Sequence, residues 1–161
     1  MGASDESVSV EVTRREQYSR FARQAEPRLR IALAAAVGQE LGGDATAEAL
    51  AYGWEHWERI EQMENPVGYL YRVGRTSVRA PRRVYFPPPP AARIPIVEPA
   101  LPSALAKLTD RQRVAVVLVH GFDWSPHDVA ALLEIDTATV ATHLRRGLAK
   151  LRKDLKVVPN A

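Results

Sequence analysis

Prolines concentrated in the middle of this 161-residue chain divide it into two parts. The stretch from Pro81 to Pro102 contains eight of the 12 prolines. Proline has no amide hydrogen and disfavours helix in the residue before it, so this stretch cannot form a regular helix. We predict an extended, polyproline-like tether. Alternatively, Tyr85 and Phe86 within it dock on a partner or on a flanking domain.

Both parts beside the tether have helical periodicity, and neither has the period-two alternation of strands. Apolar residues make up 46% and charged residues 25% of the chain, as in typical globular proteins. We therefore predict an all-α protein with two small helical domains joined by a Pro-rich linker. The expected boundaries are a disordered tail at residues 1–17, a first domain at 18–83, the linker at 84–102 and a second domain at 103–157.

The composition argues against several classes of protein. The chain has no cysteine, which excludes disulfides, thiol catalysis and thiolate metal sites. Its four histidines are scattered and no phosphate-binding glycine loop is present, so we predict neither an enzyme nor a bound cofactor or metal. No run of 18 apolar residues occurs, and the N-terminus is polar and acidic. We expect a soluble cytoplasmic protein, monomeric when free, with no membrane contact.

Charge is distributed unevenly. Residues 1–71 carry a net charge of −5, residues 72–102 carry +5 and residues 103–161 carry +3. Such asymmetry indicates that different surfaces meet different partners.

The second domain contains strong helix-start signals. Thr109 and Gln112 fit a capping box, and Ser125 precedes a proline at a first helical position. Asp136 is expected to cap the last helix after only a short turn. Two short helices joined by a tight turn predict a helix-turn-helix. Glu134 lies in that turn, where glycine is usual.

The last helix has one apolar stripe and one basic face. The stripe consists of Val140, Leu144, Leu148, Leu151 and Leu155. As a recognition helix it would enter the major groove of DNA, with Arg and Thr reading bases and Lys contacting phosphates. The alternative is a solvated basic face on a plain helical bundle. The candidate DNA-binding residues are Thr139, Thr142, His143, Arg145, Arg146, Lys150 and Lys153.

The segment LPSALAKLTDRQRVAVVLVHGFDWSPHDVAALLEIDTATVATHLRRGLAKLRKDL resembles region 4 of bacterial sigma-70 factors, particularly the extracytoplasmic-function (ECF) type. The matching pieces are "LTDRQR", "DVAALLEI" and "TVATHLRRGLAKLR". The resemblance implies that this domain binds the minus-35 promoter element through the helix after Asp136. It also implies a contact with the β flap of RNA polymerase.

The first domain is predicted to contain two helices broken at Gly42-Gly43. On the second of these, Ala47, Leu50, Trp54 and Trp57 fall on one face and are expected in the core. Tyr52 and His56 fall on the opposite face, as an interface patch or a solvated surface.

A segment that starts at Asn65-Pro66 combines aromatic rings with arginines. Rings stack on bases and Arg neutralises phosphates, so this pattern suits single-stranded nucleic acid. The alternative is two core tyrosines beside a solvated basic helix end. The candidate residues are Tyr69, Tyr71, Arg72, Arg75, Thr76 and Arg79.

Given that the second domain resembles region 4, the first domain in turn resembles region 2 of the same family. This resemblance implies recognition of the minus-10 element by the helix of Tyr69. It implies binding of the polymerase β′ clamp through Leu50, Tyr52 and His56. An anti-sigma factor is a candidate further partner, whose existence the sequence leaves open. The usual Asp-Leu-x-Gln-Glu clamp motif is here Ala-Leu-Ala-Tyr-Gly at residues 49–53. We expect an ECF-type sigma factor that directs promoter-specific initiation; the alternative is a sigma-like DNA-binding regulator or decoy without productive polymerase binding.

Overall fold

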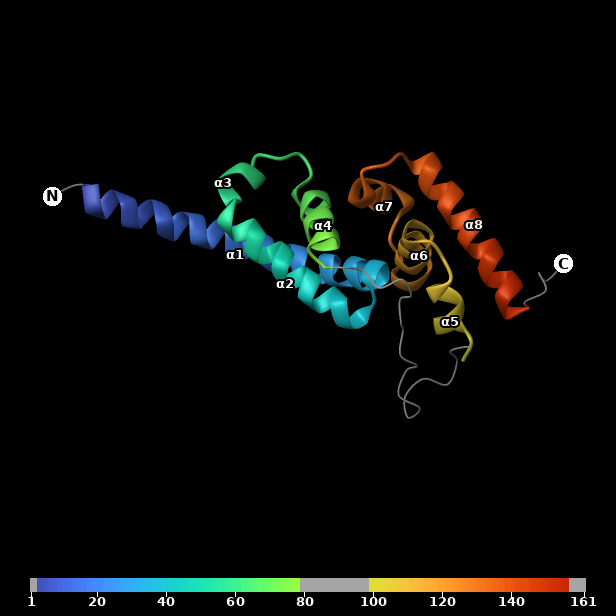
Figure 1. The fold of residues 1–161 in the computed structure, drawn as a ribbon. Helices are drawn as coiled ribbons and strands as arrows, with labels where there is room; N and C mark the ends of the chain where they lie inside the picture. The colour runs from blue at the N-terminus through green and yellow to red at the C-terminus, as the bar shows by residue number, and fades with distance from the viewer. Residues whose placement is uncertain (1–2, 79–98, 157–161) are drawn as a thin grey trace.

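The computed structural model describes residues 3–78 and 99–156. In chain order its helices are α1 (Ala3–Val37), α2 (Gln39–Glu55), α3 (Trp57–Ile60), α4 (Pro66–Ser77), α5 (Leu101–Ala106), α6 (Asp110–Val116), the π-helix η1 (Val117–Gly121), α7 (Pro126–Leu133) and α8 (Thr137–Leu155) (Figure 1). Every regular element in these ranges is helical, which confirms the all-α prediction. The predicted linker up to residue 98 lies outside the described residues, as does Arg79.

Helix α1 is much longer than the sequence analysis predicted. It begins at Ala3, where we expected a disordered tail up to residue 17. Residues 3–26 contain neither glycine nor proline, so nothing local interrupts the helix. Arg14 ties this part of α1 to α2, because its Nη2 donates to the Trp54 carbonyl at 3.2 Å. The first turns project beyond the rest of the bundle (Figure 1).

The break between α1 and α2 lies at Gly38 and not at Gly42-Gly43. Gly38 has φ 96° and ψ 159°, a conformation that residues with a Cβ rarely adopt. Gly42 and Gly43 instead lie inside α2. A Cβ on Gly42 would be 2.6 Å from the Cα of Ala34, so this glycine permits close approach of α1 and α2.

The inward face of α2 also differs from the prediction. It consists of small residues, among them Ala45, Ala49 and Gly53, which are buried. Trp54, predicted in the core, is 36% exposed, and Ala47 is exposed as well. Because α1 and α2 pack closely, their interface has no room for an indole. Trp57 is buried as predicted, and its ring lies 4.9 Å from that of Phe21.

The helix starts in the second domain are confirmed. The Thr109 hydroxyl accepts a hydrogen bond from the amide of Gln112 at 3.3 Å, within a complete capping box. Ser125 caps α7, and Asp136 caps α8 by accepting from the Thr139 amide at 2.6 Å. Helix α5 begins at Leu101, inside the predicted linker.

The two domains pack against each other. Leu29 and Leu33 of α1 belong to the same buried cluster as Val114, Leu118 and Val129 of the second domain. At the periphery, Arg28 lies 3.6 Å from the Asp128 carboxylate, and its guanidinium is 4.4 Å from the Trp124 ring centre. Helices α4 and α8 therefore belong to two domains that share one hydrophobic core.

Candidate nucleic-acid interfaces

Helices α7 and α8 form the predicted helix-turn-helix. Glu134 ends α7 in the left-handed conformation, with φ 54° and ψ 44°. A side chain with a Cβ costs roughly 1 kcal/mol there relative to glycine. Val140 and Leu151 of the predicted stripe are buried, while Leu144, Leu148 and Leu155 are partly buried. The stripe therefore faces the domain and leaves the basic face of α8 outward.

Four of the candidate residues on α8 are exposed: Arg145, Arg146, Lys150 and Lys153. Lys150 donates to the Gln112 side-chain oxygen at 3.3 Å. Within the described residues, the other three make no hydrogen bond or ion pair through their side chains. Their charges are therefore available to a ligand outside the chain.

The remaining α8 candidates are partly buried. The Thr142 hydroxyl donates to the Ala138 carbonyl at 3.1 Å, and Thr139 supports the cap at Asp136. Burial, and then the neighbouring charges of Arg111 and Arg146, lower the pKa of His143. The neutral imidazole is therefore favoured. Its buried Nε2 has no hydrogen-bond partner.

Helix α4 carries the second set of candidates. Asn65 caps it, its Oδ1 accepting from the Gly68 amide at 3.0 Å. Tyr69 is partly exposed on the side of α4 that faces α2. Its hydroxyl lies 3.2 Å from that of Tyr52 and accepts from Arg59 Nη2 at 3.0 Å.

This contact joins candidate residues that the sequence analysis treated separately. The rings of Tyr52 and His56 stack with centres 4.0 Å apart, and Arg59 also donates to the Tyr52 hydroxyl at 2.9 Å. The hydrogen bond between the two tyrosines lowers the pKa of Tyr52 and raises that of Tyr69. Arg59 follows Tyr52 by seven residues, a spacing that places both on one helical face, and the structure adds Arg59 to this group of candidate residues. Leu50 is partly buried, and its carbonyl accepts from the Tyr18 hydroxyl.

Tyr71 is buried, which contradicts its predicted role as an exposed stacking ring. It is 8% exposed, and burial raises its pKa to about 12. The neighbouring charges that act on it include Arg75 of α4 and Asp110 of α6, so the ring lies at the contact between the domains. The alternative prediction of a core tyrosine is correct for this residue.

The two arginines of α4 are bound by carboxylates of the second domain. Arg72 Nη1 lies 2.8 Å from Glu134 Oε2, and Arg75 pairs with Asp110. Thr76 is exposed and, together with these four residues, lines a cleft of about 480 Å³. We call this set of interactions between Arg72, Arg75, Asp110 and Glu134 the α4 contact.

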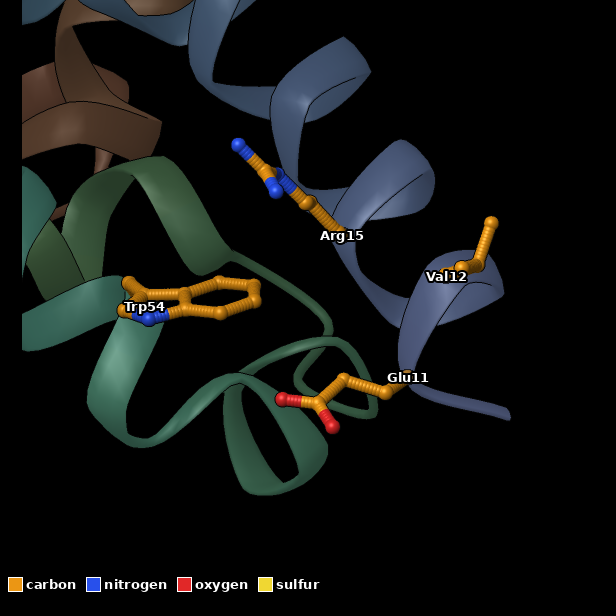
Figure 2. Close-up of a pocket in the computed structure, with 4 residues that line it drawn as sticks. All are labelled: Glu11, Val12, Arg15 and Trp54. Atoms are coloured by element: carbon orange, nitrogen blue, oxygen red, sulfur yellow. The ribbon is translucent and has the colours of Figure 1, made fainter. Parts of the chain in front are cut away.

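A separate pocket lies between the N-terminal part of α1 and the end of α2. Figure 2 shows Trp54 on one side and Glu11, Val12 and Arg15 of α1 on the other. Val12 is 50% exposed, so both walls present apolar surface. The sequence analysis missed this surface because it assigned Trp54 to the core.

Residues 99–151 match the family model described as Sigma-70, region 4. The second domain is a sigma-70 region 4 domain. The match extends from the start of α5 into α8, so it includes the helix-turn-helix and most of the basic face of α8. The sequence resemblance to the sigma-70 family is thereby confirmed for the region 4 domain.

The fold of the whole chain is similar to that of the sigma factor RpoE from Bartonella quintana, whose structure was solved in complex with the anti-sigma factor NepR. The TM-score is 0.63 at 19% sequence identity, and the match covers 88% of this chain and 98% of RpoE. Because the match covers so much of the chain, the similarity of fold extends to the domain that precedes region 4. No curated protein sequence matches the chain.

Residues 3–78 and 99–156 contain no group of three or more His, Asp or Glu side chains that could hold a metal ion. None of the helices there is long and apolar enough to span a membrane.

Proposed function

We propose that this protein is a sigma factor of the ECF type that binds core RNA polymerase and recognises minus-35 and minus-10 promoter elements. The observation that carries the proposal is the basic face of α8 in a region 4 domain, where Arg145, Arg146 and Lys153 are exposed. No enzymatic activity is part of the proposal, and the protein would act in the cytoplasm beside the polymerase.

Helix α8 would read the minus-35 duplex. The N-terminal half of a recognition helix lies deepest in the major groove, which places Thr142, Arg145 and Arg146 nearest to base edges. The planar guanidinium of Arg146 has two donors that match O6 and N7 of guanine. Lys153 lies near the end of the helix and would contact phosphates, which carry no sequence information.

Helix α4 would bind the separated strand at minus-10. Tyr69 offers a partly exposed ring, and the Arg72 guanidinium lies 5.4 Å from its centre. An aromatic ring beside a guanidinium suits single-stranded nucleic acid, because the ring stacks on a base and the guanidinium neutralises a neighbouring phosphate. Thr76 is exposed on the same helix and offers a hydroxyl to the strand. Tyr71 has no direct role in this proposal because it is buried.

The polymerase would bind at the C-terminal end of α2. Tyr52 and His56 form a partly exposed stacked pair there, and Trp54 is more exposed still. Exposed aromatic side chains are enriched at protein interfaces. The region 4 domain would contact the β flap. An anti-sigma factor is proposed as a further partner, since the similar RpoE was solved with one.

A second candidate function is that of a regulator that binds duplex DNA without polymerase. The arginines of α4 are paired within the chain whereas those of α8 are not, and the clamp motif at residues 49–53 departs from the family pattern. A regulator that binds duplex DNA through α8 alone would have these properties.

Purified full-length chain and core RNA polymerase should be co-eluted by gel filtration and then tested in run-off transcription. The templates are duplexes that the mixture selects from a random library. We expect a stable complex and transcripts with a defined start site. The double variant Arg145→Ala, Arg146→Ala should retain polymerase binding but lose selective transcription. Selective duplex binding without any polymerase complex would reject the initiation role and favour the regulator.

A further inference from the structure

Arg59 of α3 is exposed and has no carboxylate partner among the described residues. Glu55 precedes it by four residues, a spacing that pairs charges within one helix. No ion pair joins the two residues in the structure, where α2 ends at Glu55 and α3 begins at Trp57. The neighbouring Glu58 instead lies 3.6 Å from Arg14. The charge of Arg59 is therefore not neutralised by the part of the chain that the structure describes.

Two tyrosine hydroxyls hold the Arg59 side chain instead. Arg59 Nη2 donates to the Tyr52 hydroxyl at 2.9 Å and to the Tyr69 hydroxyl at 3.0 Å. The two hydroxyls lie 3.2 Å apart, and the Tyr52 ring is stacked in turn on that of His56. A neutral hydroxyl orients a guanidinium without removing its charge. The N–H groups on Nε and Nη1 of Arg59 have no acceptor in residues 3–78 and 99–156, so they remain available to a ligand.

The oriented guanidinium lies beside the ring that is proposed to stack on a base. The centre of the Tyr69 ring is 5.6 Å from the Arg59 guanidinium and 5.4 Å from that of Arg72. The two arginines differ in charge balance, because Arg72 belongs to the α4 contact, where Glu134 pairs with it at 2.8 Å. A base that stacks on an aromatic ring brings its phosphates close to the neighbouring cations. Arg59 has the charge and the free donors that such a phosphate requires.

We propose that Arg59 binds a phosphate of the single strand whose base stacks on Tyr69, and that the hydroxyls of Tyr52 and Tyr69 hold its guanidinium in position for this contact. The inference rests on the proposed role of α4 in strand binding and extends that surface to α3. It gives Tyr52 a second role, as a positioning residue that acts on the strand through Arg59. A side chain that is already held in place loses less conformational entropy on binding.

The test measures binding of the full-length chain to a fluorescent single-stranded DNA of mixed sequence, by anisotropy at several salt concentrations. Arg59→Ala should bind about fivefold more weakly at low salt, the ratio that one exposed ion pair supports. Its salt slope should fall by about 0.7, the value for one phosphate contact on a single strand. Arg59→Lys keeps the charge but not the planar fork, so it should keep the slope and recover only part of the affinity.

Arg20→Ala is the matched control for net charge. Arg20 of α1 is exposed and makes no ion pair in the described ranges. It follows the buried Tyr18 by two residues, so it lies on the opposite side of α1 from the α2 interface. This variant should bind the strand like the wild type. An equal loss for Arg20→Ala and Arg59→Ala would reduce the effect to net charge and overturn the proposal.

Tyr52→Phe tests the positioning role, because it removes one hydroxyl and keeps the ring. We expect about twofold weaker strand binding, with the salt slope of the wild type, since no charge is lost. In the Arg59→Ala background the same substitution should change nothing, because residues that act through one contact are not additive. Independent, additive losses would contradict the positioning role of Tyr52.

Arg72→Ala and a polymerase-binding assay separate this inference from the proposed function. If Arg72→Ala weakens strand binding and Arg59→Ala does not, α4 binds strands and the role given to Arg59 is wrong. If neither variant changes strand binding, α4 is not the strand-binding surface and both proposals fail. Loss of core polymerase binding by Arg59→Ala, with strand binding unchanged, would assign Arg59 to the polymerase surface and overturn the inference.

Discussion

Arg113 of α6 donates from Nε to the carbonyl oxygen of Ala35, in the last turn of α1, at 2.6 Å. Its Nη2 donates to the next carbonyl, that of Ala36, at 2.7 Å. The last carbonyls of a helix have no partner within the helix, so an arginine from the other domain caps α1. Asp110 balances the charge of this buried side chain at 2.9 Å.

Arg113→Ala should lower the free energy of unfolding by roughly 3 kcal/mol, because it leaves buried carbonyls without their donor and removes one of the two arginines that pair with Asp110. Urea denaturation followed by circular dichroism measures this loss. Arg113 is 1% exposed, whereas Arg111 in the same helix is exposed and serves as the control. Arg111→Ala should change stability by less than about 0.5 kcal/mol. Similar losses in both variants would contradict the capping role.

The adjacent glycines of α2 should respond to alanine in opposite directions. A Cβ on Gly42 meets the backbone of Ala34, so Gly42→Ala should destabilise the protein by about 1–3 kcal/mol. A Cβ on Gly43 meets nothing within 4 Å. Gly43→Ala should therefore stabilise by about 0.5–1 kcal/mol, through the better helix propensity of alanine. Thermal unfolding of the two variants checks the signs; destabilisation by both would mean that α2 is not helical at this pair.

Two residues of α8 should differ in how their loss affects duplex binding. Arg146→Ala should cost about 1–3 kcal/mol on a selected duplex and much less on a scrambled one, since it is proposed to read a base. Lys153→Ala should weaken both duplexes alike and reduce the salt slope by about one unit. Titrations at several salt concentrations give both quantities. Equal loss on both duplexes for Arg146→Ala would remove it from the base-reading set.

Tyr71 should make stability fall at alkaline pH. Burial raises its pKa to about 12 from 10.0, so the folded state keeps the proton that the unfolded state releases. This stabilisation is complete below pH 10 and is lost as pH rises from 10 towards 12. One group changes stability by at most about 1.4 kcal/mol per pH unit. Urea denaturation between pH 9 and 11.5 should show a shallower fall for Tyr71→Phe than for the control Tyr52→Phe.

Local features could be predicted from the residues alone. A helix cap depends on side chains three residues apart, and the caps at Thr109, Ser125 and Asp136 all form as expected. The left-handed conformation of Glu134 follows from the short connection between α7 and α8, which leaves few residues to reverse the direction of the chain. The basic face of α8 follows from the apolar stripe on its other side. These interactions are short in sequence, so neighbouring residues largely decide them.

Packing between distant segments decided the rest. Trp54 is exposed because the buried α2 residues at this end of the helix are Ala49 and Gly53, and no periodicity within α2 reveals how closely Gly53 approaches Tyr18 of α1. The pairing of Arg72 with Glu134 joins residues 62 positions apart. A charge pattern shows that both residues are available, but only the position of the region 4 domain against α4 brings them together. Long-range contacts depend on how whole helices fit, and that fit is a property of the assembled core.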